Sequence, residues 1–493
     1  MKKYLVISFA LLCNVVFGAI DFNNAPKPEK YGSKDAFVQA YVGYCYDNRS
    51  FIHKDTPRSN FERQYAVQAE RLWGCHVEKG TRDADASQKV KASQQSLQSA
   101  TLPEKAQGGG MFRSPAAIAN ATRGGSGEGD AETEAAVMKV LWWLKANQKP
   151  DGSWSGGNTL ANTGFALLTF LAHGEFPGSA SANEKYFGST VQLAMDYIVS
   201  RIDDSGSVVR MLGADGNEYA FLIATYALCE AYGMTLNPNY RDSVCKCLER
   251  IIKGQSLTGG WDYKINSRSV RDDMSFAGWA LQALKAGKMA GLQLEGLDEC
   301  IKKAINCMQA RNFKDGGFNY TAGGNPTGLT ATGCFAMQQF GYGNEPEVRS
   351  ALDFMREWNP AFDKAGLTGK SVGSCPQYYC YYATQCKYLA ANVPFAAGKD
   401  VQTWEKWNSA MKQAYPSSIR EANSVVDLDG VAHDSGYFSN LDAHSSRPVM
   451  DTCLVALQLM VYYRYVPFEL GGQSYDSARI AGMTFADQVR KFK

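Results

Sequence analysis

The sequence predicts an all-α protein whose main part is a closed ring of six helical hairpins. Two observations predict this fold: apolar residues recur at helical spacing through residues 132–470, and a Gln-to-Trp turn recurs between helices. The hairpins have unequal loops, because a small residue near the middle of each second helix recurs at spacings of 47 to 73 residues: Ala166, Ala227, Ala280, Ala336, Ala383 and Ala456. An open solenoid keeps a tighter period and has distinct caps, so we expect the two ends of the array to meet.

The first eighteen residues have the pattern of an export signal. Lys2 and Lys3 precede an apolar stretch over 4–17, and the small residues Val16 and Gly18 occupy the positions that a signal peptidase reads. The stretch is shorter than the ~20 residues that span a bilayer, and no later segment is long and apolar enough to do so. We therefore expect a periplasmic or extracellular protein with no membrane span.

Composition and charge exclude several classes of protein. Apolar residues make up 45% of the chain and charged residues 20%, which is typical of a globular protein and not of a disordered one. The 51 basic and 49 acidic residues become 49 of each once Lys2 and Lys3 are removed with the signal. A nucleic-acid binder normally carries a basic excess, so we expect no nucleic-acid partner.

Changes in composition divide the remaining chain. Residues 19–107 are polar and mixed, and we expect them to form a mostly helical or disordered N-terminal extension. Glycine runs mark residues 108–131 as a linker. The ring follows over 132–470, and residues 471–493 form a C-terminal tail.

Each part of the ring repeats the same order of elements. Val137, Val140, Leu141 and Leu144 fall on one helical face, the turn 148–154 follows, and a second helix of small and apolar residues begins near 161. The Gln-to-Trp turn recurs at 255–261 and in degenerate form at 309–318. Three weaker copies lack it, and their helix pairs are 197–202 with 220–229, 351–358 with 378–389, and 404–413 with 451–462.

The Gln-x(3)-Gly-x-Trp turn resembles the QW motif of the squalene cyclase and protein prenyltransferase superfamily. The amino-acid sequences of longer segments, such as 142–148 and 259–264, are similar to those of exported bacterial proteins that carry these repeats. The resemblance implies an (α/α)6 toroid of the terpenoid cyclase type, whose inner helices line a central cavity. The motif itself has a structural use, since the Gln amide can bond open backbone groups while the aromatic ring packs over the turn.

The segment 270–275 resembles the start of the acidic motif of class II cyclases, with Val270 in place of the first Asp. Asp272 and Asp273 match the last two acids, and the resemblance implies that they protonate an alkene. Two adjacent carboxylates favour this role, because repulsion between them can keep one protonated. The alternative is that they cap the helix that follows, since Asp accepts hydrogen bonds from the first free N–H groups.

Aromatic residues occupy inner-helix positions, where they either line a ligand cavity or fill the ring. In a cyclase such rings stabilise carbocations through their π faces. Asp451 begins an Asp-Thr-Cys sequence that matches one step of the prenyltransferase zinc site, but no His follows it, so we expect no metal and no cofactor. The predicted cavity residues are Tyr219, Phe276, Trp279, Phe335, Tyr378, Tyr382 and Asp451.

Two functions remain open on the sequence. In the first, the cavity binds an isoprenoid or another apolar small molecule, and Asp272 and Asp273 give the chain cyclase-like isomerase or lyase activity. In the second, the toroid is a non-catalytic scaffold that binds a protein or a glycan outside the cytoplasm. The first requires a dry cavity with a carboxylate aimed into it, whereas the second requires a filled ring.

Overall fold

The computed structural model describes residues 26–27, 30–47, 69, 131–179, 183–203, 205–207, 217–360, 376–392, 401–439 and 448–464. The predicted signal peptide, nearly all of the glycine-rich linker and the C-terminal tail lie outside these residues. The chain divides into two compact units, Met1–Glu104 and Lys105–Lys493. In the first unit, helix α2 (Lys34–Asp47) buries Phe37 and Tyr41 in a small aromatic cluster with Tyr31.

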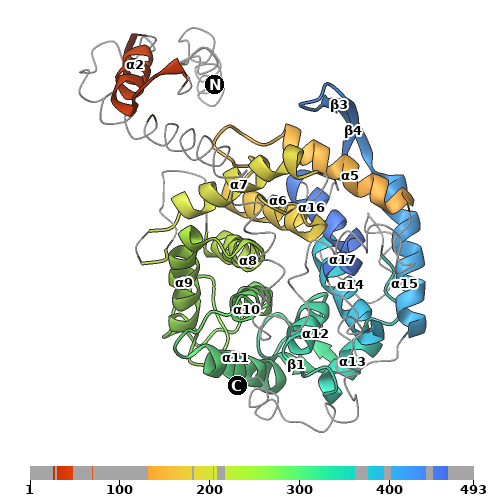
Figure 1. Ribbon diagram of the computed structural model, residues 1–493. Coiled ribbons are helices and arrows are strands. Elements are labelled where there is room, and N and C mark those ends of the chain that lie inside the picture. The colour runs from red at the N-terminus through yellow and green to blue at the C-terminus, as the bar shows by residue number, and fades with distance from the viewer. Residues whose placement is uncertain are drawn as a thin grey trace, which may run out of the picture. The chain divides into compact units, whose positions relative to one another are not determined.

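The second unit is an all-α toroid, as the sequence predicts (Figure 1). Six inner helices form a closed ring, because each contacts the next and the last contacts the first. They correspond to the second helices of the predicted hairpins. They are α6 (Thr159–His173), α8 (Glu218–Thr235), α10 (Met274–Met289), α12 (Leu329–Gln339), α14 (Pro376–Asn392) and α16 (Pro448–Leu459).

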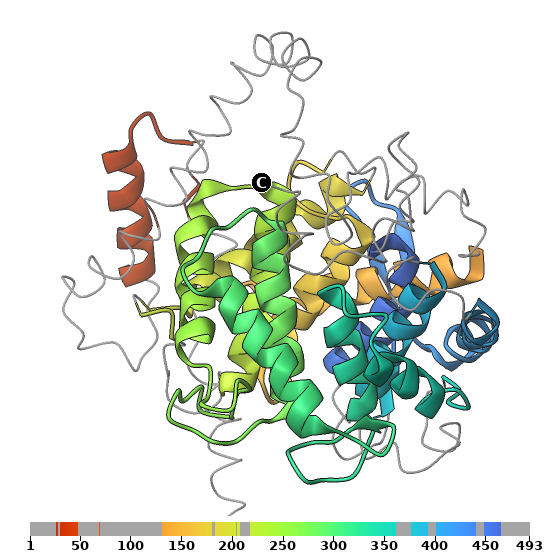
Figure 2. The ribbon, with the colours of Figure 1, turned by 90° about the horizontal axis from the view of Figure 1, so that it is seen from below.

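Six outer helices surround the inner ring, seen from a second direction in Figure 2. They precede the inner helices in the chain and are α5 (Ala131–Ala146), α7 (Glu184–Ser200), α9 (Pro238–Lys253), α11 (Leu297–Cys307), α13 (Pro346–Phe354) and α15 (Val401–Ala414). A short helix α17 (Val461–Arg464) follows α16. Within the described residues, no helix has both the length and the apolarity needed to cross a membrane.

The two complete Gln-to-Trp turns join neighbouring outer helices in the same way. Gln255 donates from Nε2 to the carbonyl of Gly259 in its own turn and to the carbonyl of Cys300 in the next outer helix, both at 2.7 Å. The buried Trp261 donates from its indole to Ile251 in the preceding outer helix, at 2.9 Å. Gln148 and Trp154 make the equivalent bonds one repeat earlier. The motif therefore fixes the spacing of outer helices.

Small residues let the inner helices approach closely. A Cβ at Gly164 of α6 would lie 3.1 Å from the backbone of Ala224 in α8. A Cβ at Gly278 of α10 would lie 2.3 Å from the methyl group of Thr332 in α12. These contacts leave no room for larger side chains, so the two glycines set the distance between α6 and α8 and between α10 and α12.

The longest spacing between repeats contains a β-hairpin that the sequence does not predict. Strands β3 (Arg420–Val426) and β4 (Ala432–Tyr437) pair antiparallel between α15 and α16. Two ring stacks hold the hairpin on outer helix α5: His433 lies on Trp142 with centroids 4.0 Å apart, and Tyr437 lies on Trp143 at 5.1 Å. We call this hairpin the clasp, because it joins the last repeat to the first. A shorter pair, β1 (Phe313–Lys314) and β2 (Gly317–Phe318), closes the degenerate turn.

A buried histidine joins the first outer helix to the end of the first inner helix. His173, the last residue of α6, contacts Glu134 of α5 through Nε2 at 3.0 Å and Glu175 through Nδ1 at 2.9 Å. Burial alone would lower the pKa of His173, but the hydrogen bonds and charges of the two carboxylates outweigh it and raise this pKa to about 9. The protonated ring therefore stabilises the fold.

We expect Gln255→Ala to lower the free energy of unfolding by ~1–3 kcal/mol, because it leaves two carbonyls without their amide donor. Gln309→Ala is the matched control, since in the degenerate repeat that side chain makes no hydrogen bond to the described residues. Chemical denaturation of both variants measures the difference. Equal stability of the two variants would contradict the role of the motif.

We expect stability to fall as the pH rises from about 6.5 through 9, because the folded-state pKa of His173 is raised above its unfolded value. The contribution is fully present below pH 6.5 and amounts to at most about 3 kcal/mol. Denaturation curves of the native chain and of His173→Gln across this range test it. The difference between the two should shrink with rising pH, and a constant difference would contradict the ion-pair assignment.

Candidate functional site

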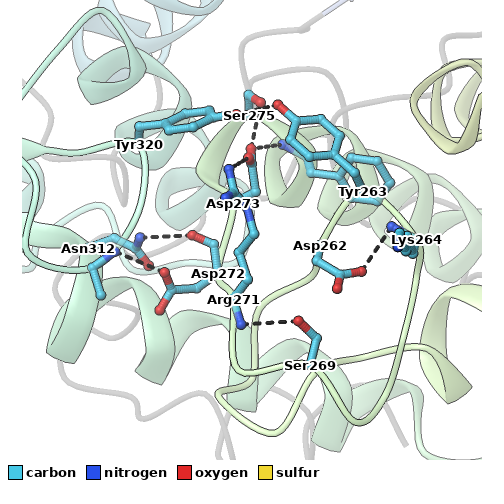
Figure 3. Close-up of polar contacts among 12 residues, drawn as sticks. Asp262, Tyr263, Lys264, Ser269, Arg271, Asp272, Asp273, Ser275, Asn312 and Tyr320 are labelled. Carbon is cyan, nitrogen blue, oxygen red and sulfur yellow. Dashed lines mark hydrogen bonds and ion pairs between the residues drawn. The ribbon is translucent and has the colours of Figure 1, made fainter.

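The most distinctive surface group lies at the end of the ring where the inner helices begin. Tyr263 and Arg271 belong to the loop before α10, and Tyr320 belongs to the loop before α12. All three side chains are partly exposed, at 43%, 45% and 37% respectively. We call them the tyrosine platform. Figure 3 shows the two phenol rings on either side of the Arg271 side chain.

Ring contacts and one ion pair hold the platform rigid. The Arg271 guanidinium lies 5.5 Å from the centre of the Tyr263 ring and 5.4 Å from that of Tyr320, and the two hydroxyls hydrogen-bond to each other. Tyr263 packs edge-on against Phe276 and stacks loosely on Tyr219. Tyr263 is thus supported by two rings, and Tyr320 by the Arg271 guanidinium and the Tyr263 hydroxyl, so the faces that reach solvent are held in place without a ligand.

Asp273 anchors Arg271 and caps helix α10. Its Oδ2 accepts a hydrogen bond from the guanidinium at 3.1 Å, and its Oδ1 accepts from the Ser275 hydroxyl at 2.6 Å and the Phe276 N–H at 3.2 Å. The side chain has 0% exposure. This hydrogen bond, donated by Arg271 to Asp273, raises the pKa of Arg271, so this arginine stays charged.

Asp272 points away from Asp273, towards the neighbouring loop (Figure 3). Its Oδ2 accepts from Nε of Arg311 at 2.6 Å, and its Oδ1 accepts from the backbone N–H of Ala322 at 2.9 Å. Arg311 lies in a π-helical turn, Met308–Asn312, that continues α11 and brings the guanidinium to the carboxylate. Asp272 thus ties the Tyr320 loop to the start of α10.

Both predicted catalytic acids are therefore occupied by N–H and O–H donors. The capping alternative describes Asp273, whereas Asp272 binds a guanidinium and a loop amide. These donors occupy the carboxylate oxygens that a reacting alkene would have to approach. The catalytic role of the two residues stays a prediction, and their geometry does not support it.

The predicted cavity residues form an aromatic cluster at the centre of the ring. Trp279 of α10 packs against Phe165 of α6, Tyr226 of α8 and Tyr381 of α14, with centroids 5.5–6.2 Å apart. Its indole donates to the Tyr219 hydroxyl at 3.2 Å. The other predicted residues contact this cluster or lie at its edge, with the exception of Asp451 in the first turn of α16, and they are Phe276, Phe335, Tyr378 and Tyr382.

These rings leave no room for an apolar ligand where they meet. Trp279, Tyr381 and Tyr382 all have 0% of their surface accessible, so no space the size of a water molecule adjoins them. Gln282 bonds both hydroxyls, donating to Tyr382 and accepting from Tyr381, each at 2.9 Å. Burial raises the pKa of Tyr382, so its hydroxyl stays neutral. These three side chains fill the space where they meet, and the ligand-cavity role of the other predicted residues stays a prediction.

No protein-family model and no curated protein sequence matches the chain. The chain is similar to solved structures of carbohydrate-active enzymes. One is the alpha-1,6-mannanase of Salegentibacter sp. HEL1_6, with 13% identity and a TM-score of 0.45, covering 67% of this chain and 98% of the other. An alpha-amylase from Clostridium perfringens covers the same shares at 10% identity and TM-score 0.45. An endo-beta-1,4-glucanase from Acetobacter xylinum does so at 12% and 0.39. Likeness at this level assigns no activity to this chain.

The predicted membership in the squalene cyclase and prenyltransferase superfamily is wrong. The solved structures that the chain resembles are those of a mannanase, an amylase and a glucanase. The physical reason lies in the Gln-to-Trp turn, whose side chains bond the backbone of neighbouring outer helices. Such contacts hold neighbouring outer helices together, so the motif indicates the ring architecture and does not identify a family.

The tyrosine platform was not among the sequence-predicted site residues. Tyr263 and Tyr320 are 57 residues apart, and the packing of α10 against α12 in neighbouring repeats brings their loops together. A signal was nevertheless present, since each follows a Gln-to-Trp turn or its degenerate copy and precedes an inner helix. Among the described residues, no three His, Cys, Asp or Glu side chains are grouped so that they could hold a metal ion.

We expect Asp272→Ala to speed amide hydrogen exchange in residues 319–328 at least roughly tenfold, because a hydrogen bond to a charged group contributes ~1.5–3 kcal/mol. Asp272→Asn should lie between the native chain and the alanine variant, since it keeps an oxygen for the Ala322 N–H but loses the charge. Asp262→Ala is the control, because that side chain bonds within its own loop, at Lys264, Asn266 and Ser269. Unchanged exchange in Asp272→Ala would contradict the tie.

Proposed function

We propose that the chain is an exported, non-catalytic toroid that binds a glycan on the tyrosine platform. The observation that carries the proposal is the pair of partly exposed phenol rings flanking a charged guanidinium. A sugar has apolar C–H faces and a rim of hydroxyls. Tyrosine offers both a flat apolar face and a hydroxyl, and arginine adds N–H donors, so the platform matches both parts of a sugar.

The filled centre of the ring supports a ligand at the end of the ring over one inside it. Trp279 and the rings around it exclude even water from the place where an isoprenoid chain would lie. The engaged carboxylates support binding over catalysis. Glycoside hydrolysis needs one carboxylic acid to donate a proton and a second carboxylate to act on the sugar or a water, whereas Asp272 and Asp273 accept bonds from Arg311 and Arg271.

A glycan is favoured over a protein partner by the make-up of the platform. Tyr and Arg are also enriched at protein interfaces, but there they are anchors in a core that loses all contact with water. Here each exposed ring carries a hydroxyl, and the group between the rings is charged. Such a surface stays hydrated between the rings and suits a ligand that is itself covered in hydroxyls.

The proposal is tested with residues 19–493 against a panel of neutral and acidic oligosaccharides of differing linkage, with affinity measured by titration calorimetry. Tyr263→Ala and Tyr320→Ala should each weaken binding about tenfold or more, because truncating an aromatic anchor typically costs over 1.4 kcal/mol. Tyr342→Ala is the matched control, since this tyrosine follows the opposite end of α12.

Two outcomes contradict the proposal. If no oligosaccharide of the panel binds, or if the platform variants bind as well as the native chain, the platform is not a glycan site. Release of reducing ends, lost in Asp272→Asn or Asp273→Asn, would show instead that the chain is an enzyme and that these carboxylates act on the substrate.

A further inference from the structure

The two loops that carry the platform differ in how they place positive and negative charge. The described charged side chains that are exposed on residues 262–271 are Lys264, Arg268 and Arg271, and all are cations. The loop 319–328 has no charged residue. The carboxylates that follow Arg271 are turned inwards, since Asp272 is 3% exposed and Asp273 is 0% exposed.

The inward carboxylates have no oxygen aimed at a ligand. Asp273 is bonded by Arg271, Ser275 and a backbone N–H, and Asp272 by Arg311 and the Ala322 N–H. Asp262 is half-buried, and its Oδ1 accepts from the N–H groups of its own turn. Hydrogen bonds hold its pKa low despite burial, so it offsets one of the two unpaired cations, Lys264 and Arg268.

Two described carboxylates of the neighbouring elements are each paired with a cation. Glu218, which begins α8 beside Tyr219, is paired with Arg250 at 2.6 Å. Asp315, in the β1–β2 turn, is paired with Lys314 at 3.7 Å. Among the described residues, no carboxylate lies within ion-pairing distance of Lys264 or Arg268. Among the described exposed side chains of the two platform loops, the charged ones are therefore all cations.

Arg271 is placed to bind an anion at the centre of this surface. A guanidinium has five N–H donors in a fixed plane, and Asp273 accepts from only one of its terminal nitrogens. The side chain is 45% exposed and held between two rings, so little freedom is lost when a carboxylate binds it. Arginine in this setting forms shorter and stronger hydrogen bonds to an anionic oxygen than to a neutral one.

We propose that the glycan taken by the tyrosine platform is anionic, with the sugar packed on Tyr263 and Tyr320 and its acidic group on Arg271. The inference rests on the proposed function and names the class of its ligand. Lys264 and Arg268 attract the anion from the surrounding solution, an effect that added salt screens.

A matched pair of ligands tests the charge directly. Oligogalacturonate carries one carboxylate per sugar, and its methyl ester has the same backbone without the charge. We expect the acid to bind at least about tenfold more tightly than the ester in low salt, and the preference to shrink in 0.5 M salt. A sulfated oligosaccharide in a third arm distinguishes recognition of carboxylate from recognition of negative charge in general.

The double variant Lys264→Gln/Arg268→Gln should bring the ratio of the two affinities towards one, while Lys253→Gln, an exposed lysine at the end of α9, should not. If acid and ester bind equally, or if only neutral members of the panel bind, the charge inference fails and the proposed function stands. If no glycan of either kind binds, both fail.

Discussion

The packing of Trp279 is the interaction on which the rest of the ring depends. Its indole is carried by α10, yet it contacts rings from α6, α8 and α14 at the same time. Tyr382, one of its neighbours, continues the chain of contacts to Phe335 in α12. Five of the six inner helices thus meet through one cluster. A ring closed only by contacts between adjacent helices could widen, whereas contacts across its centre fix its diameter.

The central aromatic cluster also supports the tyrosine platform at the end of the ring. The residues that reach solvent there are supported by the cluster beneath them: Tyr219 accepts a hydrogen bond from Trp279 and packs against Tyr263. The Asp273 carboxylate also has two roles. Its Oδ1 caps the N-terminus of α10, and its Oδ2 accepts a hydrogen bond from Arg271. The exposed groups are therefore anchored to the core, which lowers the entropy lost when a ligand is bound.

The ring could be predicted from the sequence because its signals are local. Helical periodicity and the Gln-to-Trp turn each extend over a few residues and recur. The clasp could not be predicted, since it is held by stacks on Trp142 and Trp143, nearly 300 residues earlier in the chain. A cap at the start of α10 was among the roles that the sequence predicts for Asp272 and Asp273, and Asp273 forms it. The contacts of Asp272 could not be predicted, because adjacent side chains at a helix start point in different directions and its partners, Arg311 and Ala322, lie 39 and 50 residues away in the chain.

The clasp also changes how the order of the hairpins relates to their packing. In an open array the first and last repeats each have one neighbour, but here α16 packs on α5 and α6, and the clasp covers α5 as well. Every hairpin therefore has two neighbours, and none is terminal in space. The hairpin at which the chain begins is then set by connectivity alone and does not affect how the hairpins pack. A circularly permuted chain that starts at another loop between hairpins would contain the same contacts.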